Sequence, residues 1–300
     1  MGQIQAKDLT GSMVALVTPM HADGRINLEQ WTQLIQWHIS CGTQVLVVAG
    51  TTGESALLSA AEISQLIQQA AQLCHGTNTW VMAGTGAIDP AKVSAANRQA
   101  QADGAQAVLV VTPYYLTLTQ RSLMHHFKQI ADESPLPVVL YNVPSRTGND
   151  LQAATTATLA THPNIIGIKE AKADMQRVEK LAKIKNFAVL SGDDGTFVQA
   201  MAHGADGVIS VAANARPKAI KQMCDLMQLG QVAEAELKNA EMEPFYQWLF
   251  HEPNPCPVKA IMHEAGLMDD GIRAPLLLTH VSKSDLNKYL NPIRKEFSSL

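Results

Sequence analysis

The sequence predicts a (β/α)8 barrel that carries a small helical extension at its C-terminus. Eight short apolar runs, rich in β-branched residues, recur between residues 12 and 214 of the 300-residue chain. Each run ends in a loop and precedes a helical pattern, and none alternates between apolar and polar residues. Continuous apolar strands separated by helices are typical of parallel strands buried on both faces. Eight strand–helix units in about 230 residues match the size of a (β/α)8 barrel.

The eight runs are expected to form the barrel strands in chain order. They are SMVALVTP (12–19), QVLVVAG (44–50), WVMAGTG (80–86), AVLVVTP (107–113), PVVLYNVP (137–144), IIGIKEA (165–171), FAVLSGDD (187–194) and GVISVAAN (207–214). Between them, apolar residues recur at intervals of three and four in 28–40, 59–74 and 120–131, which predicts helices there.

Capping patterns mark two of the expected helix starts. Ser59 with Glu62 has the spacing of a capping box. Asp89 followed by Pro90 fits an N-cap with proline at the first helical position.

The strand pattern stops after about residue 230. We therefore expect residues 1–230 to form the barrel with its active site, and residues 231–300 to form a C-terminal helical domain. A doubly wound sheet is the alternative, but it usually has fewer parallel strands at this length. The stretch AGTGAID resembles a dinucleotide-binding fingerprint, yet Asp89 occupies its last glycine position.

The composition excludes several classes of partner. The net charge of -4 and the isoelectric point near 6.2 leave no electrostatic footprint for nucleic acid or an anionic membrane. The four cysteines are scattered without a CxxC pair, which favours reduced thiols and a cytoplasmic location. We find no apolar run of transmembrane length and no signal-peptide pattern, and neither HEPNP nor HEAGL completes the HExxH motif of a zinc site.

The sharpest chemical signal is Lys169, which ends the apolar run IIGIK. Active sites of such barrels lie at the carboxyl ends of the strands. Desolvation there disfavours the ammonium form, and a neutral amine can form a Schiff base with a carbonyl compound. The alternative is a lysine that reaches the surface or pairs with Glu170. Adjacent strand residues face opposite ways, so Glu170 is a poor partner and the catalytic interpretation is favoured.

Other polar residues follow neighbouring strands. Tyr141 could move the protons that Schiff-base chemistry requires, although a lone strand tyrosine is more often structural. Arg146 suits two-bond recognition of a carboxylate, with a surface ion pair as the equal alternative. The GTTG turn offers Thr51, Thr52 and backbone N–H groups to another carboxylate, or is a plain turn.

The motifs GTTGES, AGTGA, TPYY, YNVPSRTG, IIGIKEA, SGDD, GVISV and EPNPxPVK occur in this order from about Gly11 to the last helices. Each is weak alone, but the set at these spacings is highly specific. The chain resembles the dihydrodipicolinate synthase family of the pyruvate-dependent class I aldolase superfamily.

The resemblance implies a reaction. Pyruvate forms a Schiff base with Lys169 and tautomerises to an enamine, which attacks the aldehyde of L-aspartate 4-semialdehyde. The adduct cyclises to 4-hydroxy-tetrahydrodipicolinate, in diaminopimelate and lysine biosynthesis. No cofactor beyond the Schiff base, and no metal, is implied.

The resemblance also implies roles for individual residues. They are the nucleophile Lys169, the proton donor and acceptor Tyr141, its relay partners Thr51 and Tyr115, the pyruvate contacts Thr52 and the backbone of Ile209, the semialdehyde-binding Arg146, and the pocket-lining Gly192. In the family the tyrosine matching Tyr115 crosses from a neighbouring subunit, and the usual assembly is a homotetramer built as a dimer of dimers.

The chain departs from the family pattern in two loops. After TPYY the family usually has Asn, often followed by a basic residue and Pro, whereas Leu116 begins the stretch LTL here. After IKEA it usually has Thr or Ser and then Gly, whereas Lys172 and Ala173 follow here. We expect these changes to affect packing or the path of the second substrate.

Family members inhibited by lysine bind it at the tight dimer interface through two His, an Asn and a Glu. The matching positions here are Ala60, Ile63, Ile88 and Lys92. Lys92 would repel the ammonium of lysine where an acid attracts it, so little or no inhibition is expected.

Two other functions remain open. A sister aldolase, such as an N-acetylneuraminate lyase or a 2-keto-3-deoxy sugar acid aldolase, is disfavoured by GTTGES and Arg146. A catalytically inactive paralogue that binds keto acids is disfavoured by four retained residues, which are Lys169, Tyr141, Thr51 and Tyr115. The fold alone does not decide among the three.

Overall fold

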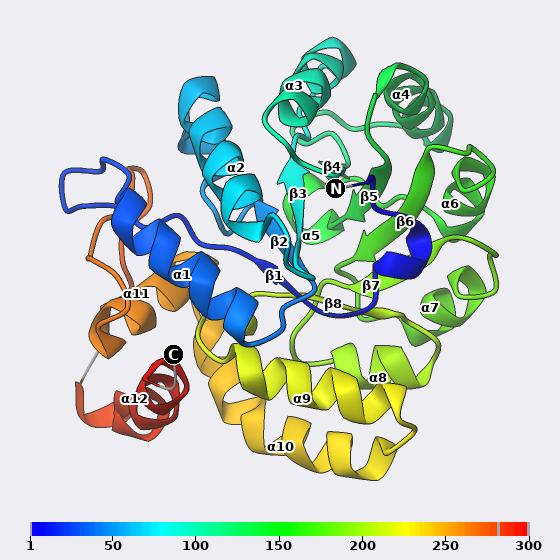
Figure 1. Cartoon of the computed structure of the whole chain (residues 1–300). Coiled ribbons are helices and arrows are strands. Elements are labelled where there is room, and N and C mark those ends of the chain that lie inside the picture. The colour runs from blue at the N-terminus through cyan, green and yellow to red at the C-terminus, as the bar shows by residue number, and fades with distance from the viewer. Residues whose placement is uncertain (1, 281–282, 299–300) are drawn as a thin grey trace.

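Eight parallel strands close into one barrel in chain order in the computed structural model, which describes residues 2–280 and 283–298 (Figure 1). Each strand pairs with the next, and β8 pairs with β1. The strands are β1 (Gly11–Ala15), β2 (Val45–Val48), β3 (Trp80–Gly84), β4 (Ala107–Val111), β5 (Val138–Asn142), β6 (Ile165–Glu170), β7 (Ala188–Ser191) and β8 (Gly207–Ser210). The predicted (β/α)8 fold is confirmed.

Helices surround this barrel and extend beyond it (Figure 1). They are α1 (Leu28–Ser40), α2 (Ala60–Cys74), α3 (Pro90–Ala102), α4 (Gln120–Glu133), α5 (Pro144–Thr147), α6 (Ala153–Leu159), α7 (Met175–Leu181), α8 (Phe197–Ala202), α9 (Pro217–Gln228), α10 (Val232–Leu249), α11 (Cys256–Ala265) and α12 (Lys283–Phe297). Short 3-10 helices are η1 (Ala6–Asp8), η2 (Ser55–Leu57) and η3 (Ala212–Asn214).

The predicted helix starts of α2 and α3 are confirmed. The Ser59 hydroxyl accepts from the Glu62 N–H, and the Glu62 carboxylate accepts from the Ser59 N–H in return. Asp89 caps α3 by accepting from the Ala91 N–H, with Pro90 at the first helical position. These caps fix where each helix leaves the barrel mouth.

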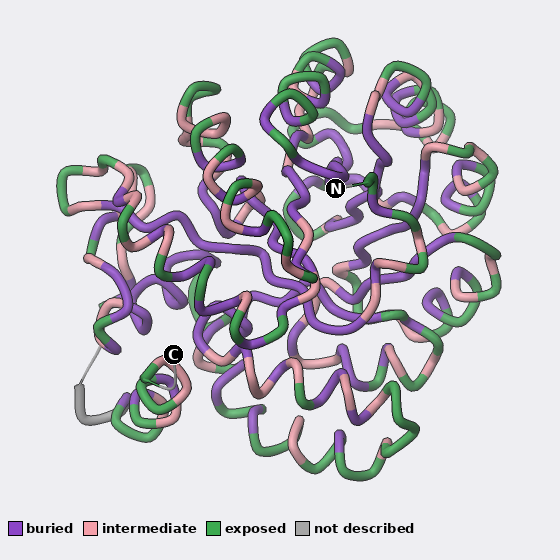
Figure 2. The backbone as a smooth tube through the Cα atoms, viewed as in Figure 1, coloured by how far each residue is buried: buried purple, intermediate pink, exposed green. Residues whose placement is uncertain are grey.

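The strands are buried on both faces, as their continuous apolar sequences predict (Figure 2). One core lies inside the barrel and includes Met13, Val47, Met82 and Val139. A larger core fills the layer between the barrel and the helices.

The segment from residue 2 to residue 10 contributes to the inner core. Ile4 and Leu9 are buried in it, and the Ile4 N–H donates to the carbonyl of Gln106, which directly precedes β4. The segment therefore closes the barrel at the end where the strands begin, which leaves the opposite end for a site.

Three helices follow the eighth β/α unit. α9 ends at Gln228, α10 begins at Val232, and α10 packs along α8 and α9. The expected division of the chain into residues 1–230 and 231–300 stays a prediction. Among the described residues, no helix combines the length and the apolar character needed to cross a membrane.

Candidate active site

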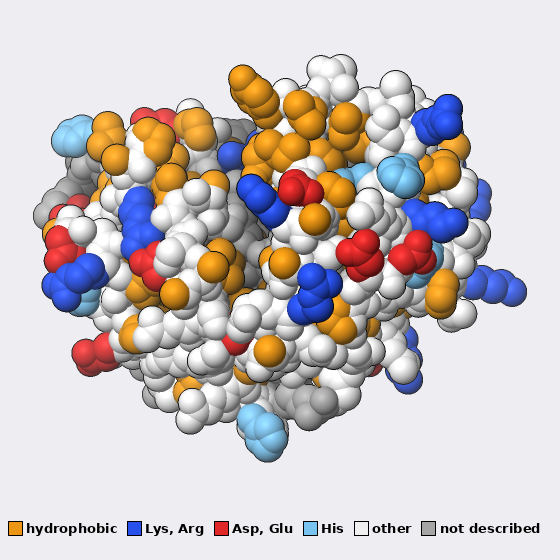
Figure 3. Space-filling view, turned by 90° about the horizontal axis from the view of Figure 1, so that it is seen from above, with side chains coloured by type: hydrophobic (Ala, Val, Ile, Leu, Met, Phe, Trp, Pro, Cys, Tyr) orange, Lys and Arg blue, Asp and Glu red, His pale blue; other side chains and the backbone are white. Residues whose placement is uncertain are grey.

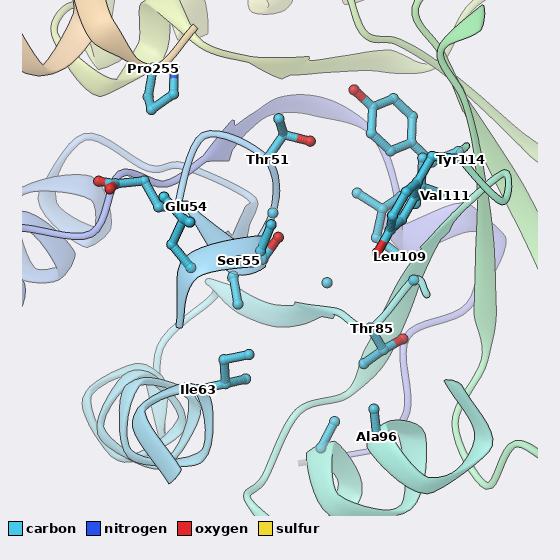
Figure 4. Close-up of a pocket in the computed structure, with 18 of the residues that line it drawn as sticks. Thr51, Glu54, Ser55, Ile63, Thr85, Ala96, Leu109, Val111, Tyr114 and Pro255 are labelled. Atoms are coloured by element: carbon cyan, nitrogen blue, oxygen red, sulfur yellow. The ribbon is translucent and has the colours of Figure 1, made fainter. Parts of the chain in front are cut away.

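A cavity of about 610 Å³ opens at the carboxyl ends of the strands. It is lined by residues from the ends of β2, β3, β4 and β5, from α5, and from the segment around Asn254. It continues outward between α2 and α3, where the surface is visibly hollowed (Figure 3). In Figure 4 the hydroxyl of Thr51 points towards the Tyr114 side of the cavity, whereas the carboxylate of Glu54 points in the opposite direction.

Lys169 and Tyr141 meet inside the barrel mouth. They are directly paired residues of β6 and β5, and the Lys169 Nζ lies 4.6 Å from the centroid of the Tyr141 ring. Lys169 is 5% exposed, and the structure records no ion pair or hydrogen bond for it within the described part of the chain. A lysine amine that lies against a phenol ring, with no carboxylate bound to it among the described residues, is suited to attack a carbonyl carbon.

Glu170 does not pair with Lys169, as the alternation of strand faces predicts. It points into the helix layer, where its carboxylate accepts from Arg177 Nε at 2.5 Å and from Asn142 Nδ2 at 2.7 Å. Burial raises the pKa of Glu170 to about 7, against the opposing effects of Arg177 and Asn142.

Gly192 leaves room for the Lys169 side chain. A Cβ at this position would lie 2.8 Å from Lys169 Cε and 2.9 Å from Ala171 Cβ, closer than atoms in contact normally approach. Ile209 is fully buried next to the mouth in β8. Neither residue is among those that line the cavity, so the pocket contacts expected of Gly192 and Ile209 stay predictions.

Asn254 joins the two groups expected to bind carboxylates. The side-chain Nδ2 of Asn254 donates to Thr52 Oγ1 at 2.9 Å, and the backbone carbonyl of Asn254 accepts from Arg146 Nη2 at 3.0 Å. Arg146 lies in the single helical turn of α5 and is exposed at the cavity wall. A guanidinium there can receive a substrate carboxylate from the cavity.

A fully buried ion pair anchors the GTTGES loop from behind. Lys259 Nζ donates to Glu54 Oε1 at 2.5 Å, and the Arg273 N–H donates to Glu54 Oε2 at 3.0 Å. Both charged side chains of the pair are 0% exposed. Arg273 also pairs with Glu62 at the start of α2, so the loop, α2 and the C-terminal segment form one connected unit.

Tyr115 is the one predicted relay residue that the structure does not bring to the others. Its side chain is 93% exposed, and its backbone has a φ of 70°. Tyr114, not Tyr115, lines the cavity of the same chain. Leu116 is held at its carbonyl by Asn149 Nδ2, which fixes this unusual loop against α5.

Sequence reasoning found the strand-end residues but missed the roles of Asn254 and Lys259. All the residues of α11 from Cys256 to Met262 are buried, so no amphipathic pattern marks Lys259 as special. The motif EPNPxPVK was the available signal, but its partners lie on a distant loop.

A (β/α)8 barrel with a buried lysine beside a tyrosine at the carboxyl ends of its strands defines a class of barrels suited to Schiff-base chemistry. Comparison with known proteins identifies the family within that class. The profile of the dihydrodipicolinate synthetase family matches residues 8–293, so the chain belongs to this family.

Individual relatives agree with this assignment. The 4-hydroxy-tetrahydrodipicolinate synthase of Xanthomonas campestris pv. campestris is 45% identical over 271 residues, which cover 90% of this chain and 89% of that protein. The enzyme of the same name from Pseudomonas aeruginosa is 43% identical over 270 residues, covering 89% and 92%. The crystal structure of the dihydrodipicolinate synthase from Acinetobacter baumannii complexed with pyruvate matches with a TM-score of 0.89 and 40% identity, covering 97% of this chain and 100% of that one.

Proposed function

We propose that this chain is a 4-hydroxy-tetrahydrodipicolinate synthase, a lyase of diaminopimelate and lysine biosynthesis. It condenses pyruvate with L-aspartate 4-semialdehyde. The observation that carries the proposal is the amine of Lys169, buried at the mouth of the barrel beside Tyr141 with no ion-pair partner recorded among the described residues. The family membership supports the choice of substrates.

The reaction begins when the Lys169 amine adds to the keto carbon of pyruvate. Loss of water gives the iminium, and loss of a proton from the methyl carbon gives the enamine. The enamine carbon attacks the aldehyde of the second substrate, whose oxygen takes up a proton. The amino group of that substrate then displaces Lys169 as the ring closes. No cofactor takes part beyond this covalent link.

Tyr141 is the group that gives and takes these protons, because its phenol ring lies against the Lys169 amine. Thr51 lines the same cavity and can pass protons to it. Tyr115 completes the relay from a second copy of the chain, which its high exposure allows. The active assembly in this proposal is a cytoplasmic homotetramer, a dimer of dimers in which each dimer completes two sites.

Recognition of the substrates falls to the neighbouring groups. Thr52 and the backbone of Ile209 bind pyruvate, and Arg146 binds the carboxylate of the semialdehyde. Asn254 supports this division, because it contacts Thr52 and Arg146 simultaneously and so holds the two substrate sites at a fixed separation. Gly192 keeps the space that the Lys169 side chain occupies.

The first test is to incubate the protein with pyruvate, reduce it with borohydride, and locate the adduct by intact mass and peptide mapping. Pyruvate trapped on Lys169 is the expected result. Aspartate semialdehyde is then tested as the second substrate before sugar aldehydes. Turnover with sugar aldehydes alone would indicate a sister aldolase. A folded sample without any adduct would overturn the proposal and favour the keto-acid-binding paralogue.

Lysine inhibition provides a second, independent test. Ile63 lines the outer part of the cavity, and Lys92 is exposed at the start of α3. Neither offers the acceptors that a lysine ammonium needs, so we expect little or no loss of activity with added L-lysine. Half-inhibition at sub-millimolar L-lysine would contradict this expectation.

A further inference from the structure

The outer faces of β5 and β6 carry polar side chains directly behind the reacting pair. Tyr141 pairs with Lys169 across the two strands, and the next residues, Asn142 and Glu170, also pair. Successive strand residues point to opposite faces, so this second pair faces the helix layer. Both of its members are at most 2% exposed. A hydrogen-bonded pair therefore stands immediately behind the nucleophile and its proton carrier.

Every polar atom of the Asn142 side chain is engaged. Its Nδ2 donates to Glu170 Oε1 at 2.7 Å and to Asp150 Oδ1 at 3.0 Å, and its Oδ1 accepts from the Leu151 N–H at 2.9 Å. Arg177 closes the arrangement from α7. Its Nε donates to Glu170 Oε2 at 2.5 Å, its Nη1 donates to Asp150 Oδ1 at 3.2 Å, and its Nη2 donates to the Leu151 carbonyl.

Lys172 is the outermost residue of this hydrogen-bonded arrangement. Its Nζ donates to Asp150 Oδ2 at 2.9 Å, while its side chain stays 43% exposed. The charges of two carboxylates and two cations thus balance in this group of side chains. We call the group the network; it consists of Asn142, Asp150, Glu170, Lys172 and Arg177. Lys172 is one of the two departures from the family pattern after β6, and its side chain lies away from the residues lining the cavity. It connects the loop after β6 to the segment that follows α5.

We propose that this network is a positioning device, with Glu170 as its central residue, that fixes the Lys169 amine relative to Tyr141. The inference rests on the proposed nucleophilic role of Lys169. Three physical reasons support it. A lysine side chain has many rotamers, and in the described part of the chain no ion-pair partner selects one of them for Lys169. The ends of β5 and β6, from which Tyr141 and Lys169 project, are joined by the strand ladder and by the hydrogen bond from Asn142 to Glu170 on the outer face. Displacement of a reacting group by about 1 Å can cost about 100-fold in rate.

Glu170→Gln is the principal test. The amide keeps the size of the side chain but must place a donor against Asn142 or against Arg177, and it removes the charge that balances Arg177. We expect the rate constant for trapping pyruvate on Lys169 to fall about tenfold in fully folded protein, because the amine is less well placed. The equilibrium affinity for pyruvate should change much less than this rate.

Glu296→Gln is the matched control. Glu296 accepts from Arg216 Nε at 2.6 Å in a part-buried ion pair between α12 and the start of α9, remote from β5 and β6. Both variants replace the carboxylate partner of an arginine, so both should lower thermal stability. If the effect of Glu170→Gln were only structural, both folded variants would trap pyruvate at the wild-type rate. That result would overturn the proposal.

Lys172 gives a second series should Glu170→Gln fail to fold. Lys172→Met removes the outer ion pair at a half-exposed position and should slow trapping about twofold to threefold, whereas Lys172→Arg should restore the rate. Wild-type rates in both Lys172 variants, with Glu170→Gln unfolded or unaffected, would contradict the proposal. Absence of trapping in the wild-type protein would instead overturn the proposed function, so the two failures can be told apart.

Discussion

Two lysines are buried near the mouth of this barrel, and they differ in their partners. Lys259 is 0% exposed and donates to Glu54 at 2.5 Å. Lys169 is 5% exposed, and the nearest recorded partner of its amine is the face of the Tyr141 ring. Burial therefore does not by itself mark a reactive lysine. The difference lies in whether a carboxylate among the described residues accepts a hydrogen bond from the amine.

The surroundings follow from where each lysine lies in the fold. Lys259 comes from α11 and meets the GTTGES loop, where it donates to Glu54 Oε1. The other oxygen of this carboxylate accepts from the Arg273 backbone N–H. Lys169 lies near the end of β6 with its amine against the ring of Tyr141, and Tyr141 lines the cavity. One lysine holds the GTTGES loop in place, and the other is available for chemistry.

Among the variants that test this comparison, Lys169→Met should have the largest effect on activity. The variant loses the nucleophile, so we expect activity to fall by at least about 10³-fold and the borohydride adduct to disappear. The melting temperature should stay unchanged or rise, because an unpaired buried amine is replaced by an apolar side chain of similar size. Residual trapping on another lysine would show that the two lysines were assigned the wrong roles.

Lys259→Met should have the opposite profile. It leaves the Glu54 carboxylate buried without its cation, which costs about 3–5 kcal/mol of unfolding free energy. Urea denaturation measures this loss, and the double variant Glu54→Gln/Lys259→Met should recover much of it. Folded Lys259→Met protein should still trap pyruvate on Lys169. A stable but trap-negative variant would contradict a purely structural role.

Gly192→Ala tests the same comparison by crowding Lys169 and not Lys259. The added Cβ would meet Lys169 Cε at 2.8 Å, so we expect trapping to slow about tenfold and stability to fall by about 1–3 kcal/mol. Gly195→Ala is the control, because its Cβ would approach nothing closer than 3.6 Å in the same loop region. Equal trapping rates in the two variants would show that Gly192 does not position Lys169.

The smallest expected effect is a pH dependence of the cluster around Lys259. Arg273 donates to Glu62 and holds the pKa of that carboxyl at about 2, below its usual 4.5. The pKa of Glu62 is lower in the folded state than in the unfolded state. The Glu62–Arg273 pair therefore stabilises the protein above pH 4.5 and loses this effect as the pH falls towards 2. The difference in melting temperature between wild type and Glu62→Gln should therefore shrink over this range. A constant difference would exclude the ion pair as its cause.

Much of the fold could be predicted from sequence because its signals are local. The eight apolar runs, the helix over residues 28–40 and the capping box at Ser59 each depend on neighbours a few residues apart. Lys169 could be recognised for the same reason, since a charged residue that ends an apolar strand is visible in the sequence. Its separation from Glu170 followed from the alternation of strand faces.

The partners of these residues were decided by the tertiary structure. Glu54 and Lys259 are 205 residues apart in the sequence, and Asn254 and Thr52 are 202 residues apart. No local period connects such pairs, and both lysines look alike as single cations in apolar stretches.

The sequence by itself determined the barrel, the order of its strands and the presence of a lysine at the end of the sixth. Only the tertiary structure decided that Lys259 pairs with Glu54 and that no described residue forms an ion pair with Lys169. It also decided that Glu170 joins Arg177 behind the site. The physical reason is that strand and helix patterns depend on short-range periodicity, whereas the partners of a buried charged group depend on which distant side chains the closed barrel brings to it.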